Sequence, residues 1–282
     1  MFKNLILMKR FYIAERFSFD LGDKTEDNQI VDDDLSALSK KYKYFPKTKE
    51  ELRELVDRLI EERGNEADLN DIYTGYVTDM SELFFNNHVR YNNFNGDISG
   101  WDVSSVTDVH NMFLRCKNFN KDLGSWDVSN VENMSGMFDN CQSFNQDLSR
   151  WNVSNVKNMG GMFYNCKSFN QDLNRWNVSN VKNMNSMFWD CKMFNQDLSR
   201  WNVSNVTDMN AMFAYCYKFN QDLSRWDVSN VTDMCFMFYN CRRFMNQDKD
   251  LTRWDVNNVE LADSMFFKCP LPEEKHPKFE DL

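Results

Sequence analysis

The chain has 282 residues, of which 42% are apolar and 15% aromatic, and its formal net charge is -10. This apolar content is enough for one sizeable ordered domain or a long array, and it excludes a disordered chain. The negative charge repels phosphate backbones and anionic lipids at long range, so nucleic acid is not an expected partner. No stretch reaches the 18 consecutive apolar residues that a membrane-spanning helix needs, and we therefore expect no transmembrane segment.

Residues 1–40 are predicted to form an N-terminal segment with an acidic linker. Its first 19 residues mix apolar and basic side chains, a pattern compatible with a helix, a strand or a membrane-surface segment. Residues 20–34 are acidic and poor in apolar side chains, which indicates a flexible linker. Lys9 and Arg10 interrupt the first apolar run, so we expect no standard secretory signal, and the sequence by itself favours a cytoplasmic protein.

A helical cap is predicted within residues 41–70. Thr48 and Glu51 form the pattern of a capping box, and Gly64 supplies a helix end. Between them the apolar residues recur at helical spacing on one face, at Leu52, Leu55, Val56, Leu59 and Ile60. We expect this face to cover the open side of the first unit of the array that follows.

An array of about eight units is predicted over residues 71–269, followed by a charged tail over 270–282. Tryptophan recurs every 25 residues from Trp101 to Trp226, and Trp254 follows after 28. One unit reads FNQDLSRWNVSNVKNMGGMFYNCKS, from Phe144 to Ser168. A repeat of this length indicates stacked units that bury a continuous core, with atypical units at both ends.

The apolar spacing inside a unit predicts one short strand and one short helix. Trp151 and Val153 lie two apart, as on one side of a strand, while Leu148 precedes Trp151 by three and implies a bend. The following V-x-x-M-x-x-M-F-x-x-C pattern has helical spacing. We therefore expect an α/β repeat solenoid whose strands form a parallel sheet along one side.

Six cysteines, from Cys116 to Cys241, are also spaced by 25 residues. One cysteine per unit favours a ladder of reduced, buried thiols over a disulfide framework. With only three histidines in the chain, we expect no transition-metal site and no cofactor. Calcium bound by the stacked oxygens of F-N-Q-D is a further interpretation, although no glycine-rich calcium loop accompanies them.

A row of arginines falls in register along the array, at Arg150, Arg175, Arg200, Arg225 and Arg253. An isolated row of this kind could grip carboxylates, sulfates or phosphates, and the first four are the candidate anion-contacting ladder. A parallel row of aspartates begins at Asp147. A salt-bridge lattice between the two rows is therefore the favoured interpretation.

The positions that differ between units are the best candidates for a binding site, because stacking does not dictate them. Large aromatic residues gather at or near the position after the M-F pair, at Tyr164, Trp189, Tyr215, Tyr217 and Tyr239. Such residues are favoured in binding hot spots, so we predict a partner-binding stripe. The alternative is that they pack locally against the surface of the array.

The unit from Phe194 to Phe213, FNQDLSRWNVSNVTDMNAMF, closely resembles the repeat of BspA-like leucine-rich repeat surface proteins, with its W-[DN]-V-S-x-V-T-x-M-x-x-M-F-x-x-C signature. The resemblance covers about residues 71–269, and the preceding helix also resembles the segment before such arrays. It implies a right-handed leucine-rich-repeat-like stack, no enzymatic activity, and association with cell surfaces, adhesion or host contact.

No constellation for catalysis is convincing, because a nucleophile with a histidine base, a carboxylate pair and a phosphate-binding glycine loop are all missing from the pattern. The sequence therefore predicts a non-enzymatic scaffold that binds a protein partner. A structural spacer that associates with itself through the ends of the array is the alternative.

Overall fold

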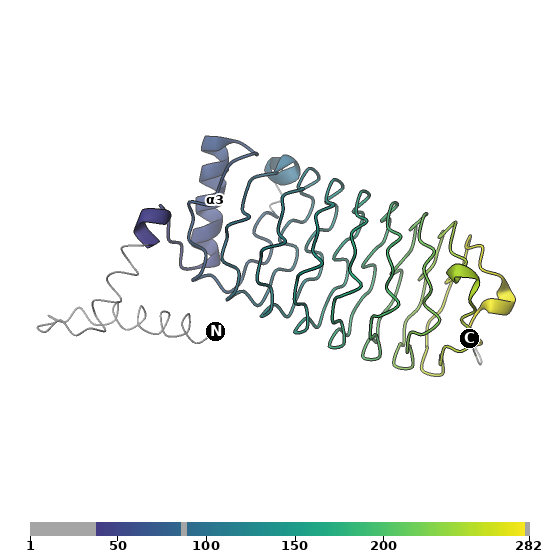
Figure 1. The fold of residues 1–282 in the computed structure, drawn as a ribbon. Coiled ribbons are helices and arrows are strands. Elements are labelled where there is room, and N and C mark those ends of the chain that lie inside the picture. Colours follow the sequence, from purple (N-terminus) through teal and green to yellow (C-terminus); the bar gives the residue numbers. More distant parts are fainter. Residues whose placement is uncertain (1–37, 86–88, 280–282) are drawn as a thin grey trace, which may run out of the picture.

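The computed structural model describes residues 38–85 and 89–279 (Figure 1). They include α3 (Lys49–Arg63) and the short 3-10 helices η1 (Val89–Asn93), η2 (Asn246–Asp248) and η3 (Glu273–Lys275), and residues 38–41 are helical as well. After α3 the chain runs through a row of similar coils that extends to the C-terminal end of the described part. The expectations for residues 1–37 lie outside the described residues.

The coils are joined by backbone contacts between equivalent residues of neighbouring units. Isolated parallel bridges link Asp108 to Asn133, Asn133 to Asn158, and so on to Leu261. Next to each bridge, amide groups donate to carbonyls of the following unit, as from Met159 to Asn183 at 2.9 Å and from Phe163 to Met187 at 2.9 Å. Each unit therefore completes its backbone hydrogen bonds with the next one, as buried backbone groups require.

The short helix expected in each unit is wrong, because the segment forms consecutive turns. The amide of Met162 donates to the Met159 carbonyl and that of Tyr164 to the Gly161 carbonyl. The alternating amides of Gly161 and Phe163 donate to the next unit. Gly161 has φ +62° and Asn165 has φ +56°, both in the left-handed region. A left-handed residue every four positions prevents an α-helix but gives nearly the same spacing of apolar side chains.

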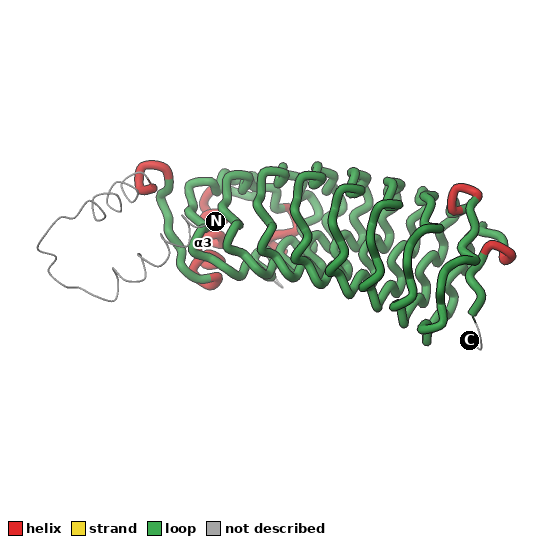
Figure 2. The backbone as a smooth tube through the Cα atoms, turned by 60° about the horizontal axis from the view of Figure 1, so that its bottom comes forward, coloured by secondary structure: helices red, strands yellow, loops and turns green. Residues whose placement is uncertain are grey.

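The short strand expected around Trp151 is also wrong. Leu148 and Trp151 are joined by a tight turn, with the amide of Trp151 donating to the Leu148 carbonyl at 3.0 Å, so the inferred bend is confirmed. From Asn133 to Asp233 the parallel bridges lie instead at the Asn or Asp before the first Met of each unit. No strand longer than an isolated bridge occurs in the part of the chain described here, and Figure 2 accordingly shows the array as loops and turns.

The core consists of ladders of identical side chains. Phe163 lies 4.1 Å from Phe169, the first residue of the next unit, and 5.7 Å from Phe188 of that unit, measured between ring centroids. Trp176 and Trp201 stack at 6.4 Å, and the indole of Trp201 donates to the Leu173 carbonyl at 2.9 Å. Stacking therefore buries each ring between its copies and satisfies the polar atom of each indole.

The predicted helix is confirmed as α3. Thr48 Oγ1 accepts from the amide of Glu51 at 3.2 Å, the chain leaves the helix at Gly64, and all five predicted apolar residues are buried. Glu51 itself accepts from the amide of Lys47 rather than from Thr48, so the capping box is shifted by one residue. The helix ends and its buried face were thus correctly predicted.

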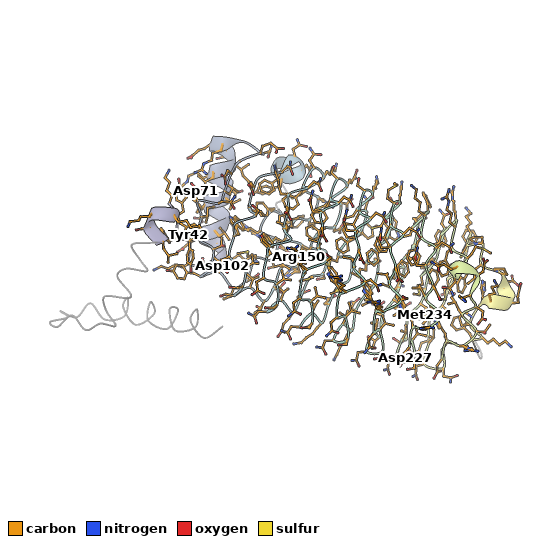
Figure 3. The ribbon with its side chains drawn as sticks, in the orientation of Figure 1. Tyr42, Asp71, Asp102, Arg150, Asp227 and Met234 are labelled. Atoms are coloured by element: carbon orange, nitrogen blue, oxygen red, sulfur yellow. The ribbon has the colours of Figure 1, made fainter. Side chains whose placement is uncertain are left out.

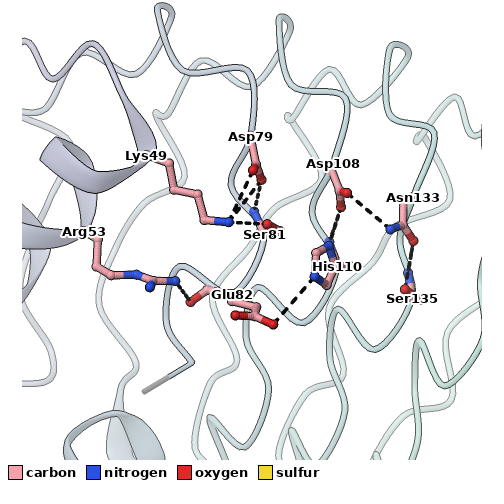
Figure 4. A network of polar contacts seen from close by, with 9 residues as sticks. All are labelled: Lys49, Arg53, Asp79, Ser81, Glu82, Asp108, His110, Asn133 and Ser135. Carbon is pink, nitrogen blue, oxygen red and sulfur yellow. Dashed lines mark hydrogen bonds and ion pairs between the residues drawn. The ribbon is translucent and has the colours of Figure 1, made fainter. Parts of the chain in front are cut away.

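Basic side chains join α3 to the first unit of the array (Figure 4). Lys49 Nζ lies 3.3 Å from Asp79 Oδ2 and also contacts the Ser81 hydroxyl, and Arg53 donates to the Glu82 carbonyl at 2.6 Å. The buried face of α3 belongs to the same apolar core as the first units. The helix therefore closes this end of the core, as expected of a terminal cap.

The opposite end is closed differently. The ring of His276 stacks on Phe266 at 3.8 Å, and the amide of Leu251 donates to the Lys275 carbonyl at 2.8 Å, so the tail covers part of the last unit. The amides of Ala262 and Ser264, which correspond to the donors of earlier units, meet no acceptor among the described residues. This edge offers hydrogen-bond donors.

Candidate functional site

Five aromatic side chains form a continuous line across successive units, which we call the aromatic row. Ring centroids are separated by 4.3 Å between Tyr164 and Trp189, 5.3 Å between Trp189 and Tyr215, 5.3 Å between Tyr215 and Tyr239, and 5.2 Å between Tyr239 and Phe267. The first four are only partly buried, and Phe267 is 49% exposed. The structure thus brings together residues that the sequence places up to four units apart.

The aromatic row lies outside the core because of its place in the unit. Phe163 and Phe188 are fully buried, and the residues that directly follow them, Tyr164 and Trp189, are partly exposed. Stacking fixes the buried phenylalanines but leaves the next position free to vary, as Leu114 shows in an earlier unit. An aromatic side chain at this position is therefore not required by the fold.

Tyr217 lies beside the aromatic row rather than within it. Its ring is 6.4 Å from that of Tyr215. Two cations face the same ring, with Lys192 Nζ at 5.7 Å and the Arg242 guanidinium carbon at 4.9 Å from the centroid. Such cation–π contacts keep the tyrosine next to positive charge. All five predicted aromatic residues are therefore neighbours, as the stripe requires.

Sequence reasoning missed Phe267 and the exposed Phe236. Phe267 follows an M-F pair, Met265 and Phe266, as Tyr239 does one unit earlier, but the preceding residues of its unit have drifted from the pattern. Phe236 is 41% exposed and its ring lies 5.7 Å from that of Tyr239. Aligning the last unit on M-F-x-x-C would have found Phe267.

Two carboxyl groups near the aromatic row are held toward their neutral form. Burial raises the pKa of Asp139 to about 6, against the opposing effects of the Asn140 amide and Arg115. Burial also raises the pKa of Asp190, although Lys192 Nζ lies 3.7 Å away. Burial thus makes the ionised form of both carboxyl groups less favourable than in solvent.

The predicted salt-bridge lattice is wrong. Arg150, labelled in Figure 3, and its equivalents Arg175, Arg200 and Arg225 are exposed. Across the described part of the chain, no ion pair joins these arginines to the aspartate row. Asp147 instead accepts from the amide of Ser149 at 2.8 Å, which, with the Ser149 hydroxyl, holds the pKa of that carboxyl below its usual value. The aspartates stabilise turns, and the anion-contacting ladder stays a prediction.

The polar residues of F-N-Q-D join neighbouring units. Asn120 Oδ1 accepts from the amide of Asn145 at 2.9 Å, and Gln146 Nε2 donates to the Asn120 carbonyl at 2.9 Å. These oxygens already accept hydrogen bonds, and a calcium ion would have to break those hydrogen bonds in order to bind the oxygens. Within residues 38–85 and 89–279, no group of three or more His, Cys, Asp or Glu side chains is placed to hold a metal ion.

The cysteine ladder is buried, as predicted. Cys166 Sγ donates to the Phe138 carbonyl at 3.0 Å, and its equivalents repeat this contact along the array. All eight cysteines are free, and burial raises the pKa of Cys166 well above its usual value. A thiol held neutral in this way is a core side chain rather than a nucleophile.

A family model described as "Mycoplasma protein of unknown function, DUF285" matches residues 52–176 and 162–279. The chain belongs to the DUF285 family. The first match begins within α3 and the second ends in the tail, so the two matches together cover most of the cap helix and the array. No curated protein and no solved structure matches the chain. Of the helices that the structure describes, none is long and apolar enough to span a bilayer.

Proposed function

We propose that this DUF285 protein is a non-enzymatic scaffold that binds a protein partner through the aromatic row. The observation that carries the proposal is the unbroken line of partly exposed rings from Tyr164 to Phe267, at positions that the core leaves free. Exposed aromatic clusters of this kind are typical of interaction sites, because they bury large apolar area at small entropic cost.

The construction of the array suits this role. Every unit is tied to the next by backbone hydrogen bonds such as that from Gly161 to Asn185 at 2.7 Å, and by the ring contacts of the core. A surface on such a support is largely preformed. Little ordering is then required when a partner binds, which favours affinity.

The finer classification belongs to the same proposal. We assign the stack to the right-handed leucine-rich-repeat-like solenoids and the chain to the BspA-like repeat proteins, on the strength of its W-N-V-S-N-V-T-D-M signature. Adhesion or contact with another cell is the role that this assignment favours. It requires that the array reach a cell surface.

Self-association through the ends of the array is the second candidate, favoured by the exposed Leu261 and Phe267 at the last unit. The hydrogen-bonding groups at the open edge disfavour this self-association. The open edge offers amide donors, and two copies meeting there would bring donors to donors. The other end is covered by α3, so end-to-end stacking would require the helix to move.

Affinity capture tests the proposed function. The intact chain and a Trp189→Ala, Tyr239→Ala variant serve as bait in extracts of the source cell and of any host. A control variant, Tyr42→Ala with Phe45→Ala, removes two aromatic rings near the other end of the molecule. We expect a partner that the intact chain and the control retain and the first variant loses. Retention by all three baits would contradict the proposal.

A further inference from the structure

A line of basic side chains accompanies the aromatic row, in the two positions after the ladder cysteines and at the end of the array. We call it the basic column: Lys167, Lys192, Lys218, Arg242, Arg243 and Lys268. Three of these cations lie over aromatic rings. Lys192 and Arg242 lie over the ring of Tyr217 beside the row, and Lys268 Nζ lies 5.2 Å from the ring centroid of Phe267 in the row. The column and the row therefore form one surface.

This surface differs in sign from the chain as a whole. The net charge of the chain is -10, yet six basic side chains gather in five successive units. The two carboxyl groups described above compensate for this charge only in part, because Asp139 and Asp190 are two acidic side chains against six basic ones, and Asp190 is next to Lys192. A positive surface on an acidic protein selects for a negatively charged partner and disfavours contact of this surface with the same surface of another copy.

The orientation of the rings selects among negatively charged partners. Tyr164 and Trp189 are stacked with an interplanar angle of 5°, and Tyr239 and Phe267 with an angle of 22°. These four rings each use one face on a neighbouring ring, and Tyr215 between the two pairs meets Trp189 at 65° and Tyr239 at 54°. Stacking within the row thus occupies faces that a planar ligand would need. Nucleobases bind proteins by stacking on free aromatic faces, whereas protein side chains pack well against ring edges.

We propose that the aromatic row and the basic column together bind an acidic protein segment that carries apolar or aromatic side chains. Carboxylates of the partner pair with Lys192, Arg242 and their neighbours, and its apolar side chains pack against the row. The surface runs along five units, so the segment binds in an extended form. This inference rests on the proposed function and specifies the chemistry of its partner.

The test uses a labelled peptide of glutamates interspersed with phenylalanines, and its binding is measured by fluorescence anisotropy. Matched peptides replace every glutamate by glutamine or by lysine, or every phenylalanine by alanine, and a single-stranded RNA of similar length serves as a second anion. We expect the acidic, phenylalanine-containing peptide to bind most tightly and its affinity to fall as salt is raised. Tighter binding of the RNA, or equal binding of the glutamine peptide, would overturn the proposal.

Charge reversal locates the binding site. Lys192→Glu with Arg242→Glu should weaken binding of the acidic peptide by about tenfold, because two attractive contacts become repulsive. The control, Arg150→Glu with Arg175→Glu, changes the net charge equally on exposed arginines outside the row and should change affinity less than about twofold. If the control instead loses binding, the arginine ladder is the anion site and the proposal is wrong.

The same variants separate this inference from the proposed function. If Trp189→Ala, Tyr239→Ala abolishes capture of a cellular partner and Lys192→Glu, Arg242→Glu does not, the scaffold function stands and the acidic partner is refuted. If neither variant affects capture, both are refuted. Loss with both variants, together with binding of the acidic peptide, supports both.

Discussion

The buried phenylalanine ladder and the aromatic row are both lines of rings that cross the units, yet they follow different rules. The ladder has the same residue in every unit, and Phe163, Phe188 and Phe213 are fully buried. In the aromatic row the residue changes between tyrosine, tryptophan and phenylalanine and remains partly exposed. Recurrence marks what the stack requires, and variation marks what the stack leaves free for binding.

The largest effect that tests this comparison is expected from two neighbouring residues. Phe188→Ala removes a buried ring that lies 4.2 Å from Phe194 and 5.7 Å from Phe213, and should lower the free energy of unfolding by about 3–5 kcal/mol. Trp189→Ala, one residue further along, should cost about 1 kcal/mol. Urea denaturation followed by circular dichroism measures both changes in the free energy of unfolding. Similar values for the two variants would contradict the distinction between the buried ladder and the aromatic row.

A second effect concerns the carboxyl group at the start of the aromatic row. Burial raises the pKa of Asp139 in the folded chain to about 6, above its ordinary value in the unfolded chain. Between about pH 4 and pH 6 the folded chain therefore binds a proton at Asp139 that the unfolded chain does not. Stability contributed by this group is therefore lost as the pH rises through that range. Asp139→Asn should remove the loss.

The expected gain for Asp139→Asn is about 1–2 kcal/mol at pH 8, and it should shrink toward zero at pH 4. Thermal unfolding of both chains at the two pH values measures it. A variant that is less stable than the parent at pH 8 would show that the ionised carboxylate has a stabilising role in the row.

The smallest of the three effects tests the turn structure of the units. Gly161 has φ +62°, and a Cβ there would meet only Tyr164 Cβ, at 3.9 Å. Gly161→Ala should therefore lower stability by about 1 kcal/mol through backbone strain alone. In an α-helix the same change would raise stability by about 0.5–1 kcal/mol. The sign of the change in unfolding midpoint decides between the two structures.

Much of the fold could be predicted from periodicity and end signals. The 25-residue period identified the core residues, because a position repeated in every unit is one that stacking uses. Thr48 and Gly64 marked the two ends of α3. The local structure of the units could not be read in the same way, because consecutive turns with left-handed residues place apolar side chains three and four apart, as a helix does. The signal of the difference was Gly, Asn or Asp at the positive-φ positions, as at Gly161 and Asn165, because these residue types tolerate the left-handed region.

The candidate site was predictable only as a set of residues. Sequence spacing identified Tyr164, Trp189 and Tyr239 as variable aromatic positions, but their contacts depend on how the units stack. For the arginine row, spacing predicted a contact that does not form. Asp147 precedes Arg150 by three residues, yet the turn between them directs the carboxylate to the amide of Ser149. Spacing alone does not show which of two partners a side chain takes.

The measurement that tests the account most directly combines stability and binding on one preparation of the Trp189→Ala, Tyr239→Ala variant. We predict that it unfolds within about 2 kcal/mol of the parent, since both rings are partly exposed, and that it no longer retains the captured partner. A variant that loses as much stability as Phe188→Ala, or one that keeps the partner, would contradict the claim that the aromatic row is a binding surface supported by, and separate from, the core.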